Sequence, residues 1–190
     1  MNISRLPIPD SQALPEELQT LFATAKDKLG FVPNVLHIYS LRPDHLLAWR
    51  NHYELLMRGE SKLTLAQREM IAVTVSSLNR CFYCSTTHPA FLRLELAKEG
   101  KDPNIASELQ FAPLDADISD AEKAMLEFAI KITLESHNIL PSDLEKLRQH
   151  GFADEAIFDI AEVAAMFNLT NRLINALGGK PNPEYHQLGR

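Results

Sequence analysis

Hydrophobic residues recur every three or four positions along almost the whole chain, which is the spacing of helices with one buried face. No segment shows the strict alternation of a half-buried strand, and no two-residue hairpin turn is found. The pattern therefore predicts an all-α protein. We expect residues 1–190 to form a single-domain helical bundle of about seven to eight helices, and two similar helical halves are one arrangement that the pattern allows.

Prolines, glycines and capping residues divide this pattern into elements. The predicted helices cover 15–29, 44–57, 64–78, a segment that carries both cysteines and ends before Gly100, and then 104–110, 119–136, 142–150 and 154–177. Residues 1–14 are expected to be an extended arm, 31–35 a connector and 180–190 a polar tail. The central motif then lies in 44–100 and the second helical half in 119–178.

Three helix starts carry the signature of a capping box, a hydroxyl residue followed three positions later by Glu or Gln. The predicted pairs are Thr64 with Gln67, Ser119 with Glu122, and Ser142 with Glu145.

Composition narrows the class of protein. A chain of 190 residues with 45% hydrophobic residues can bury one sizeable core. Its net charge is −6, and its 19 Lys and Arg residues are scattered among 25 acids, which argues against binding nucleic acid or an anionic membrane. No apolar run approaches the ~18 residues of a spanning helix, and no secretory signal is visible. We expect a cytoplasmic protein with no membrane partner, and no glycine-rich loop indicates a cofactor.

The segment NRCFYCSTTH contains both cysteines, and they suggest chemistry. In a reducing compartment a lone Cys pair is more often catalytic or metal-binding than structural. Cys81, Cys84 and His88 are spaced at i, i+3 and i+7, so they share one helical face. A thiol in the first turn of this helix meets the positive end of the helix dipole, which lowers its pKa and makes it reactive.

Glu69 is the candidate partner of His88. Asn79 and Arg80 interrupt the apolar pattern, which predicts a hinge between two antiparallel helices. At 1.5 Å per residue, Glu69 lies about 16 Å before the hinge and His88 about 12 Å after it, so the two side chains can meet. Glu69 would then orient the imidazole, and His88 would exchange a proton with a cysteine one turn away. This chain suits a thiolate that attacks an electrophile such as a peroxide.

The stretch EMIAVTVSSLNRCFYCSTTH resembles the alkylhydroperoxidase D core of the carboxymuconolactone decarboxylase family. That core has a glutamate, eleven residues, a C-x-x-C and a histidine four beyond the second cysteine, and Glu69, Cys81, Cys84 and His88 match it one for one. The flanking segments VPNVLHIYSLRPDHLLAWR, NRLINALG and PNPEYHQLGR are similar to the peroxidase-related branch of that superfamily.

The resemblance implies a function. Members of this superfamily are all-helical homo-oligomers that reduce peroxides through the cysteine pair, so the expected partners are a small peroxide and a dithiol or lipoyl-type electron donor protein. The family order makes Cys84 the attacking thiolate and Cys81 the resolving thiol. The residues alone favour the reverse, because Cys81 is nearer the helix start.

Two positions depart from the family pattern. Tyr83 stands where alkylhydroperoxidase D has a second histidine of its proton relay, so Tyr83 is an accessory candidate at most. Pro89 follows His88 within the helix, where it removes a backbone hydrogen bond and can redirect the imidazole.

Plainer interpretations remain open for the motif. The cysteines could be small core residues, or could bind zinc together with His88, although no fourth ligand is visible. Glu69 taken alone would be a solvated helix residue. Two further alternatives are a non-redox acid–base enzyme of the carboxymuconolactone decarboxylase type, and a non-catalytic redox sensor or oligomerisation module.

Other polar and aromatic residues are assigned structural roles. We interpret five histidines as surface or capping residues: His45, His52, His137, His150 and His186. Trp49, Phe91 and Phe167 are interpreted as core. A polar stripe on the last helix is read first as a solvated face, with a seam against the motif helix or another subunit as the alternative: Asn168, Asn171, Arg172 and Asn175.

Overall fold

The computed structural model describes residues 2–190, which form nine α-helices and three short 3-10 helices, with no strand in that range. The all-α prediction is therefore confirmed. The helices are α1 (Glu16–Leu29), α2 (Asn34–Tyr39), α3 (Pro43–Arg58), α4 (Leu65–Leu78), α5 (Phe82–Lys98), α6 (Ile105–Phe111), α7 (Asp120–Glu135), α8 (Pro141–Gln149) and α9 (Asp154–Leu177). The 3-10 helices are η1 (Ser11–Ala13), η2 (Ser136–Asn138) and η3 (Pro183–His186).

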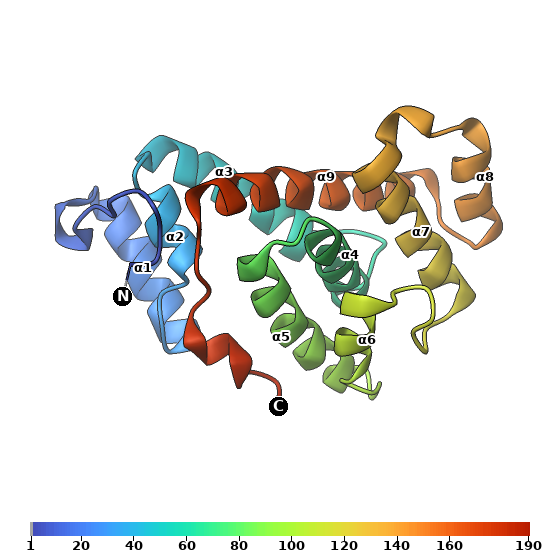
Figure 1. The fold of residues 1–190 in the computed structure, drawn as a ribbon, viewed down its shortest axis with the longest axis horizontal. Coiled ribbons are helices and arrows are strands. Elements are labelled where there is room, and N and C mark those ends of the chain that lie inside the picture. Colours follow the sequence, from blue (N-terminus) through green and yellow to red (C-terminus); the bar gives the residue numbers. More distant parts are fainter. Residues whose placement is uncertain (1) are drawn as a thin grey trace.

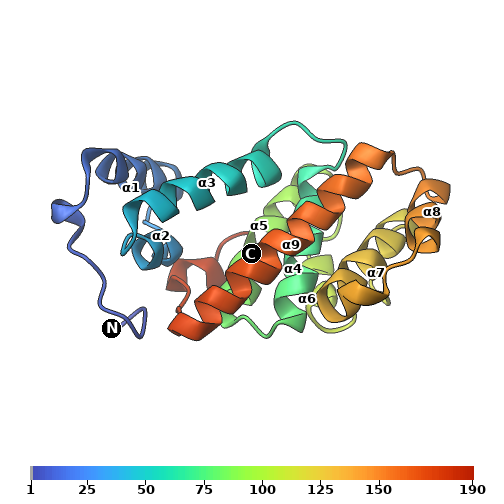
Figure 2. The ribbon, with the colours of Figure 1, turned by 90° about the horizontal axis from the view of Figure 1, so that it is seen from above.

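The long helix α9 organises the molecule. It lies across α4 and α5, with α7 and α8 at one end and α1 and α2 at the other (Figure 1). Seen from above, α3 runs beside α9 (Figure 2). Within residues 2–190, no helix combines the length and apolar character needed to cross a membrane.

Two of the three predicted capping boxes are present. The Thr64 hydroxyl accepts from the Gln67 amide at 3.1 Å, and the Gln67 side chain accepts from the Thr64 amide at 3.0 Å. Ser119 and Glu122 make the same reciprocal pair.

The third capping box is wrong. Helix α8 begins at Pro141, and the Asp143 carboxylate accepts from the Leu140 amide at 2.7 Å. A proline fits the first helical position because its missing N–H has no intrahelical partner there. Pro141 therefore starts the helix before Ser142 can cap it, and Asp143 takes the place predicted for Glu145.

Helix α2 was not predicted, because its first residues were assigned to a connector. Its start is stabilised from the far end of the chain, since the Asn182 side-chain oxygen accepts from the Asn34 amide at 2.7 Å. The amide group of Asn182 also donates to the Val32 carbonyl at 3.0 Å. A six-residue helix held by a residue 148 positions away leaves little local signal.

The buried apolar residues form two clusters. The larger one surrounds α4, which packs against α5, α7 and α9. The smaller one contains both cysteines together with residues of α1 and α2, including Leu18, Phe22 and Leu36. Burying such side chains contributes about 1.5–3 kcal/mol each, so the first two helices are held firmly over the cysteine pair.

Candidate active site

The cysteine pair follows a sharp turn between α4 and α5. Asn79 ends α4, and Arg80 adopts a left-handed conformation with φ 50°. Cys81 then occupies the N-cap of α5, one position before the first turn where the sequence placed it, and its amide donates to the Ser76 carbonyl at 3.0 Å. The turn lies where a hinge was predicted, and α5 folds back against α4 (Figure 2).

Folding back brings Glu69 of α4 against His88 of α5. The Glu69 Oε2 atom lies 2.7 Å from His88 Nδ1, and Glu69 is fully buried while His88 is 5% exposed. The alternative that Glu69 is a solvated helix residue is therefore wrong. A buried carboxylate at this distance fixes the orientation of the imidazole and selects its Nδ1–H form, which leaves Nε2 free for chemistry.

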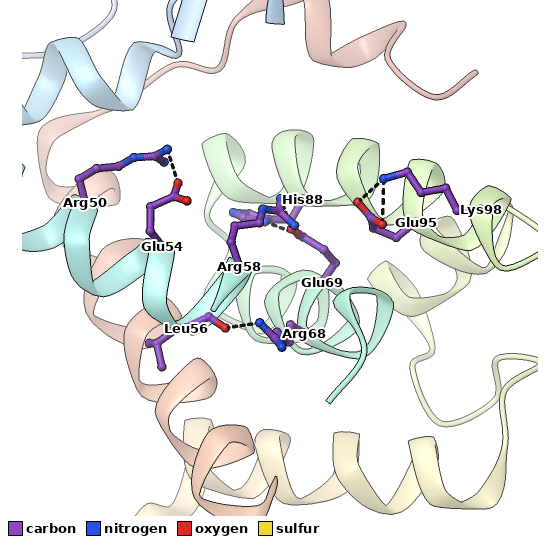
Figure 3. A network of polar contacts seen from close by, with 9 residues as sticks. All are labelled: Arg50, Glu54, Leu56, Arg58, Arg68, Glu69, His88, Glu95 and Lys98. Carbon is purple, nitrogen blue, oxygen red and sulfur yellow. Dashed lines mark hydrogen bonds and ion pairs between the residues drawn. The ribbon is translucent and has the colours of Figure 1, made fainter. Parts of the chain in front are cut away.

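Arg58 is a site residue that the sequence analysis missed. Its Nη2 atom donates to Glu69 Oε1 at 3.3 Å, so Glu69 joins an arginine on one oxygen and a histidine on the other (Figure 3). Burial acts to lower the pKa of Arg58, but the neighbouring acidic groups, with the Glu69 carboxylate first among them, together outweigh it and the pKa is raised. The guanidinium thereby compensates the buried carboxylate charge. Arg58 lies on α3, and its position in the sequence gives no indication that its side chain contacts Glu69 of α4.

Pro89 is accommodated within α5 by a neighbouring helix. Proline has no amide hydrogen to bond the carbonyl four residues earlier, which is that of Ser85. The Gln110 side chain of α6 donates to this Ser85 carbonyl at 2.7 Å. Because the freed carbonyl is satisfied, α5 continues to Lys98, and His88 keeps its contact with Glu69.

The two cysteines are free thiols with different surroundings. Cys81 is fully buried and Cys84 is 2% exposed. A hydrogen bond from the Cys84 thiol is the main cause that lowers the pKa of Cys81 to about 7, and burial opposes it. The same hydrogen bond and burial raise the pKa of Cys84 well above its usual value. The pair therefore favours one thiolate on Cys81, with Cys84 as its donor.

The polar stripe of α9 is a seam against the motif, which corrects the first interpretation of a solvated face. Asn171 is fully buried; its amide donates to Ser76 Oγ at 3.1 Å, and its oxygen accepts from the Asn79 amide group at 3.0 Å. Asn168 also accepts from Asn79, and the Asn175 amide donates to the Asn79 carbonyl. Arg172 fits the prediction of a solvated face, because it is exposed and its side chain bonds only back to α9; Asn175 is exposed as well but keeps its bond to Asn79. The hydrogen-bonding capacity of Asn171 helps to lower the pKa of both cysteines.

A cavity of about 300 Å³ opens beside the motif, between α1, α2, α3, α5, α9 and η3. Cys84 and His88 line it, whereas Cys81 and Glu69 do not. Trp49, Phe91 and Phe167 line it as well, so their interpretation as core residues is incomplete. The five histidines assigned to the surface are indeed exposed.

Tyr83, which stands in the family's second-histidine position, lines the same cavity as Cys84 and His88. Its hydroxyl oxygen accepts from the Val35 amide at 3.0 Å, and burial raises its pKa well above the usual range. Tyr185 of the tail segment approaches the same hydroxyl and lines the cavity. Sequence reasoning missed Tyr185, because a short polar tail gives no sign that it returns to the site.

No three His, Cys, Asp or Glu side chains among residues 2–190 are arranged to hold a metal ion, and this includes the Cys81, Cys84 and His88 set considered for zinc.

Comparison with known proteins agrees with this architecture. The model of the carboxymuconolactone decarboxylase family matches residues 43–99, which contain the whole motif. A peroxidase-related protein from Ralstonia eutropha JMP134, described as an alkylhydroperoxidase AhpD core, is 40% identical and superposes with a TM-score of 0.95 over 100% of this chain and 98% of its own. The chain belongs to the peroxidase-related branch of the alkylhydroperoxidase D superfamily.

A second member of this branch, an uncharacterized peroxidase-related protein from Silicibacter sp. TM1040, is 42% identical, with a TM-score of 0.93 over 100% of this chain and 97% of its own. The superfamily fold extends further, to the debrominase Bmp8, with 20% identity, a TM-score of 0.74, and coverage of 98% and 95%. At that identity the likeness concerns the fold alone. Among curated proteins, no sequence matches this chain significantly.

Proposed function

We propose that this protein is a thiol-dependent peroxidase that reduces an organic hydroperoxide with the Cys81–Cys84 pair. The observation that carries the proposal is that Cys84 and His88 line one cavity while His88 Nδ1 lies 2.7 Å from the buried Glu69 carboxylate. A nucleophile and a proton donor thus reach the same space, with the donor oriented from behind.

Cys84 is the attacking residue in this proposal, because it lines the cavity and Cys81 does not. The pKa of Cys81 is lowered and that of Cys84 is raised, so the pair loses its first proton more readily from Cys81, with the Cys84 thiol as hydrogen-bond donor. When a peroxide enters, the shared proton moves to Cys81 and the anion forms on Cys84. Membership of the family supports the same order, whereas the helix dipole alone favoured Cys81.

The reaction then proceeds in two steps. The Cys84 thiolate attacks the terminal peroxide oxygen, the O–O bond breaks, and the leaving alkoxide takes a proton from the His88 imidazolium and departs as the alcohol. Cys84 is now a sulfenic acid. Cys81 attacks its sulfur, a disulfide forms, and the hydroxyl leaves as water. A dithiol donor returns two electrons and two protons and restores both thiols.

Glu69 and Arg58 act through His88. The Glu69 carboxylate stabilises the imidazolium that supplies the proton, and Arg58 compensates the carboxylate charge when His88 is neutral. Glu69 is fully buried behind His88 and does not line the cavity, so it is a positioning residue. Arg58 does line the cavity, and its effect on His88 passes through Glu69.

The electron donor and the assembly state are part of the same proposal. Cys84 is 2% exposed and lies in a cavity, so the donor has to present its dithiol on a narrow group, which fits a lipoyl-type arm.

Family membership favours a homo-oligomer, and light scattering on a sizing column measures the assembly state.

Peroxide consumption by the reduced protein tests the proposal. We expect repeated turnover of cumene hydroperoxide with a dithiol donor, and a peptide linking Cys81 to Cys84 after peroxide treatment and digestion without reductant. A redox sensor would oxidise once and stop. If both thiols still alkylate fully after peroxide, the peroxidase assignment fails.

The thiolate should form near neutral pH. The pKa of Cys81 is lowered to about 7 from the 9.0 of an ordinary thiol, so the ultraviolet absorbance of the thiolate should rise with pH through a midpoint near 7. Asn171→Ala removes a buried donor and should move this midpoint upward. A protein lacking both cysteines provides the baseline. A midpoint near that of an ordinary thiol would contradict the stabilised pair.

A further inference from the structure

The cavity in front of Cys84 is lined by apolar or aromatic residues and by charged residues, and the two groups together indicate the chemical class of its ligand. Most of the wall is apolar or aromatic, including Leu21, Leu36, Trp49, Tyr53 and Phe167. A volume of about 300 Å³ lies at the lower end of the range of about 300–1,000 Å³ found for small-molecule pockets. The cavity therefore has room for the body of a small organic molecule and offers it apolar contacts.

The charged residues of the wall are mostly cations. Lys28, Arg50 and Arg58 line the cavity, and Glu54 is the acid that accompanies them. This balance is the reverse of that of the whole chain, whose net charge is −6. A concave site with low-dielectric walls concentrates ions of the opposite sign, so this cavity attracts anions although the protein repels them.

The cations differ in how far they are already neutralised. Arg50 pairs with Glu54 on α3, and Arg58 pairs with the buried Glu69 (Figure 3). Lys28, in the last turn of α1, has no acid within ion-pair distance among residues 2–190. Its ammonium group is the uncompensated charge of the wall. It comes from α1, while Cys84 and His88 come from α5.

We propose that the site takes organic hydroperoxides that carry an anionic group, such as a carboxylate, on an apolar body, and that Lys28 of the α1 wall binds that group. This inference rests on the proposed function and adds its substrate class. The peroxide end meets Cys84 and His88, the body lies against the aromatic wall, and the anion remains at the α1 side. Cleavage of the O–O bond by Cys84 and His88 follows the same two steps as in the proposed function.

A matched pair of peroxides tests the proposal. Cumene hydroperoxide and its para-carboxylate have the same body and the same peroxide, and differ by one charge. At low ionic strength we expect kcat/KM to be about two- to fivefold higher for the carboxylate, the factor that an exposed ion pair supplies. The preference should shrink as salt is added.

Two lysine variants locate the effect. Lys28→Gln should bring the two kcat/KM values together. Lys26→Gln is the matched control, because Lys26 lies in the same turn of α1 and carries the same charge but does not line the cavity, so the preference should survive. Equal kcat/KM for the two peroxides in the unmodified protein, or the same loss in both variants, would overturn the proposal.

Binding of the product alcohols separates this proposal from the peroxidase assignment. Calorimetry with cumyl alcohol and its para-carboxylate requires no turnover. If neither peroxide is reduced but the carboxylate alcohol binds more tightly and depends on Lys28, the peroxidase assignment fails and the anionic ligand class stands. If the two alcohols bind equally, the anionic ligand class fails, whatever the rate of peroxide reduction.

Discussion

Replacing Cys84 with Ser should abolish peroxide reduction, the largest effect expected for any single substitution in this protein. Cys84 is the cysteine that lines the cavity, and a serine hydroxyl does not form an anion at neutral pH. The remaining Cys81 is fully buried and does not face the cavity, so its lower pKa gives it no access to the peroxide. Steady-state consumption of cumene hydroperoxide measures the loss.

Cys81→Ser is the matched variant, and it should behave differently. Cys84 keeps its place at the cavity, so the first oxidation should still occur, whereas no disulfide can follow. We expect one equivalent of peroxide to be consumed and a sulfenic acid on Cys84, detected by a dimedone adduct in mass spectrometry. The reverse result, with a sulfenic acid on Cys81 in the Cys84→Ser protein, would assign the attack to Cys81.

Loss of the His88 imidazole should give the second largest effect. Removing a general acid–base group costs about 10²–10⁴-fold in rate, so His88→Ala should slow peroxide reduction by a factor in that range. Glu69→Gln keeps the shape and one hydrogen bond but removes the negative charge that favours the imidazolium, so it should slow the reaction less. The order of the two variants matters more than the size of either effect.

A double-mutant cycle distinguishes a relay from two independent losses. Glu69 contacts His88 at 2.7 Å, so in the His88→Ala background the Glu69 substitution should cost little more. In a Cys81→Ser background, alkylation of Cys84 should require a higher pH in both single variants, because each removes support for the anion. Strict additivity, or an unchanged rate for Glu69→Gln, would falsify the relay and make Glu69 a structural residue.

The proximity of Glu69 and His88 could be predicted because it follows from local rules. Both residues lie on regular helices, and Asn79 and Arg80 broke the apolar pattern between them. Similar distances from a hinge along two paired helices allow the side chains to meet, and the structure places them 2.7 Å apart. Spacing alone also put the two cysteines at the start of one helix.

Residues that reach the site from other elements could not be predicted in this way. Arg58 comes from α3, Asn171 from α9 and Tyr185 from η3. Their spacing resembles that of ordinary surface polar residues, and for that reason the stripe containing Asn171 was assigned first to solvent, with a seam against the motif helix or another subunit as the alternative. A buried polar group shows its role only when its partners are known.

Pro89 is a position where the local sequence predicted a distortion that a distant residue prevents. A proline inside a helix is locally unfavourable, and it put the direction of His88 in question. The Gln110 side chain removes the difficulty by donating to the Ser85 carbonyl at 2.7 Å. The helix therefore tolerates Pro89 because of a neighbour that lies 21 positions further along the chain.

The sequence by itself determined the helical class, most helix boundaries and the shared face of Cys81, Cys84 and His88, because these depend on the 3.6-residue period and on residues within one turn of each other. The tertiary structure decided which cysteine faces the cavity, which cation compensates Glu69 and which charge remains free on the cavity wall. Those outcomes depend on how α1, α3 and α9 pack around the motif, and packing between distant segments leaves no periodic trace in the chain.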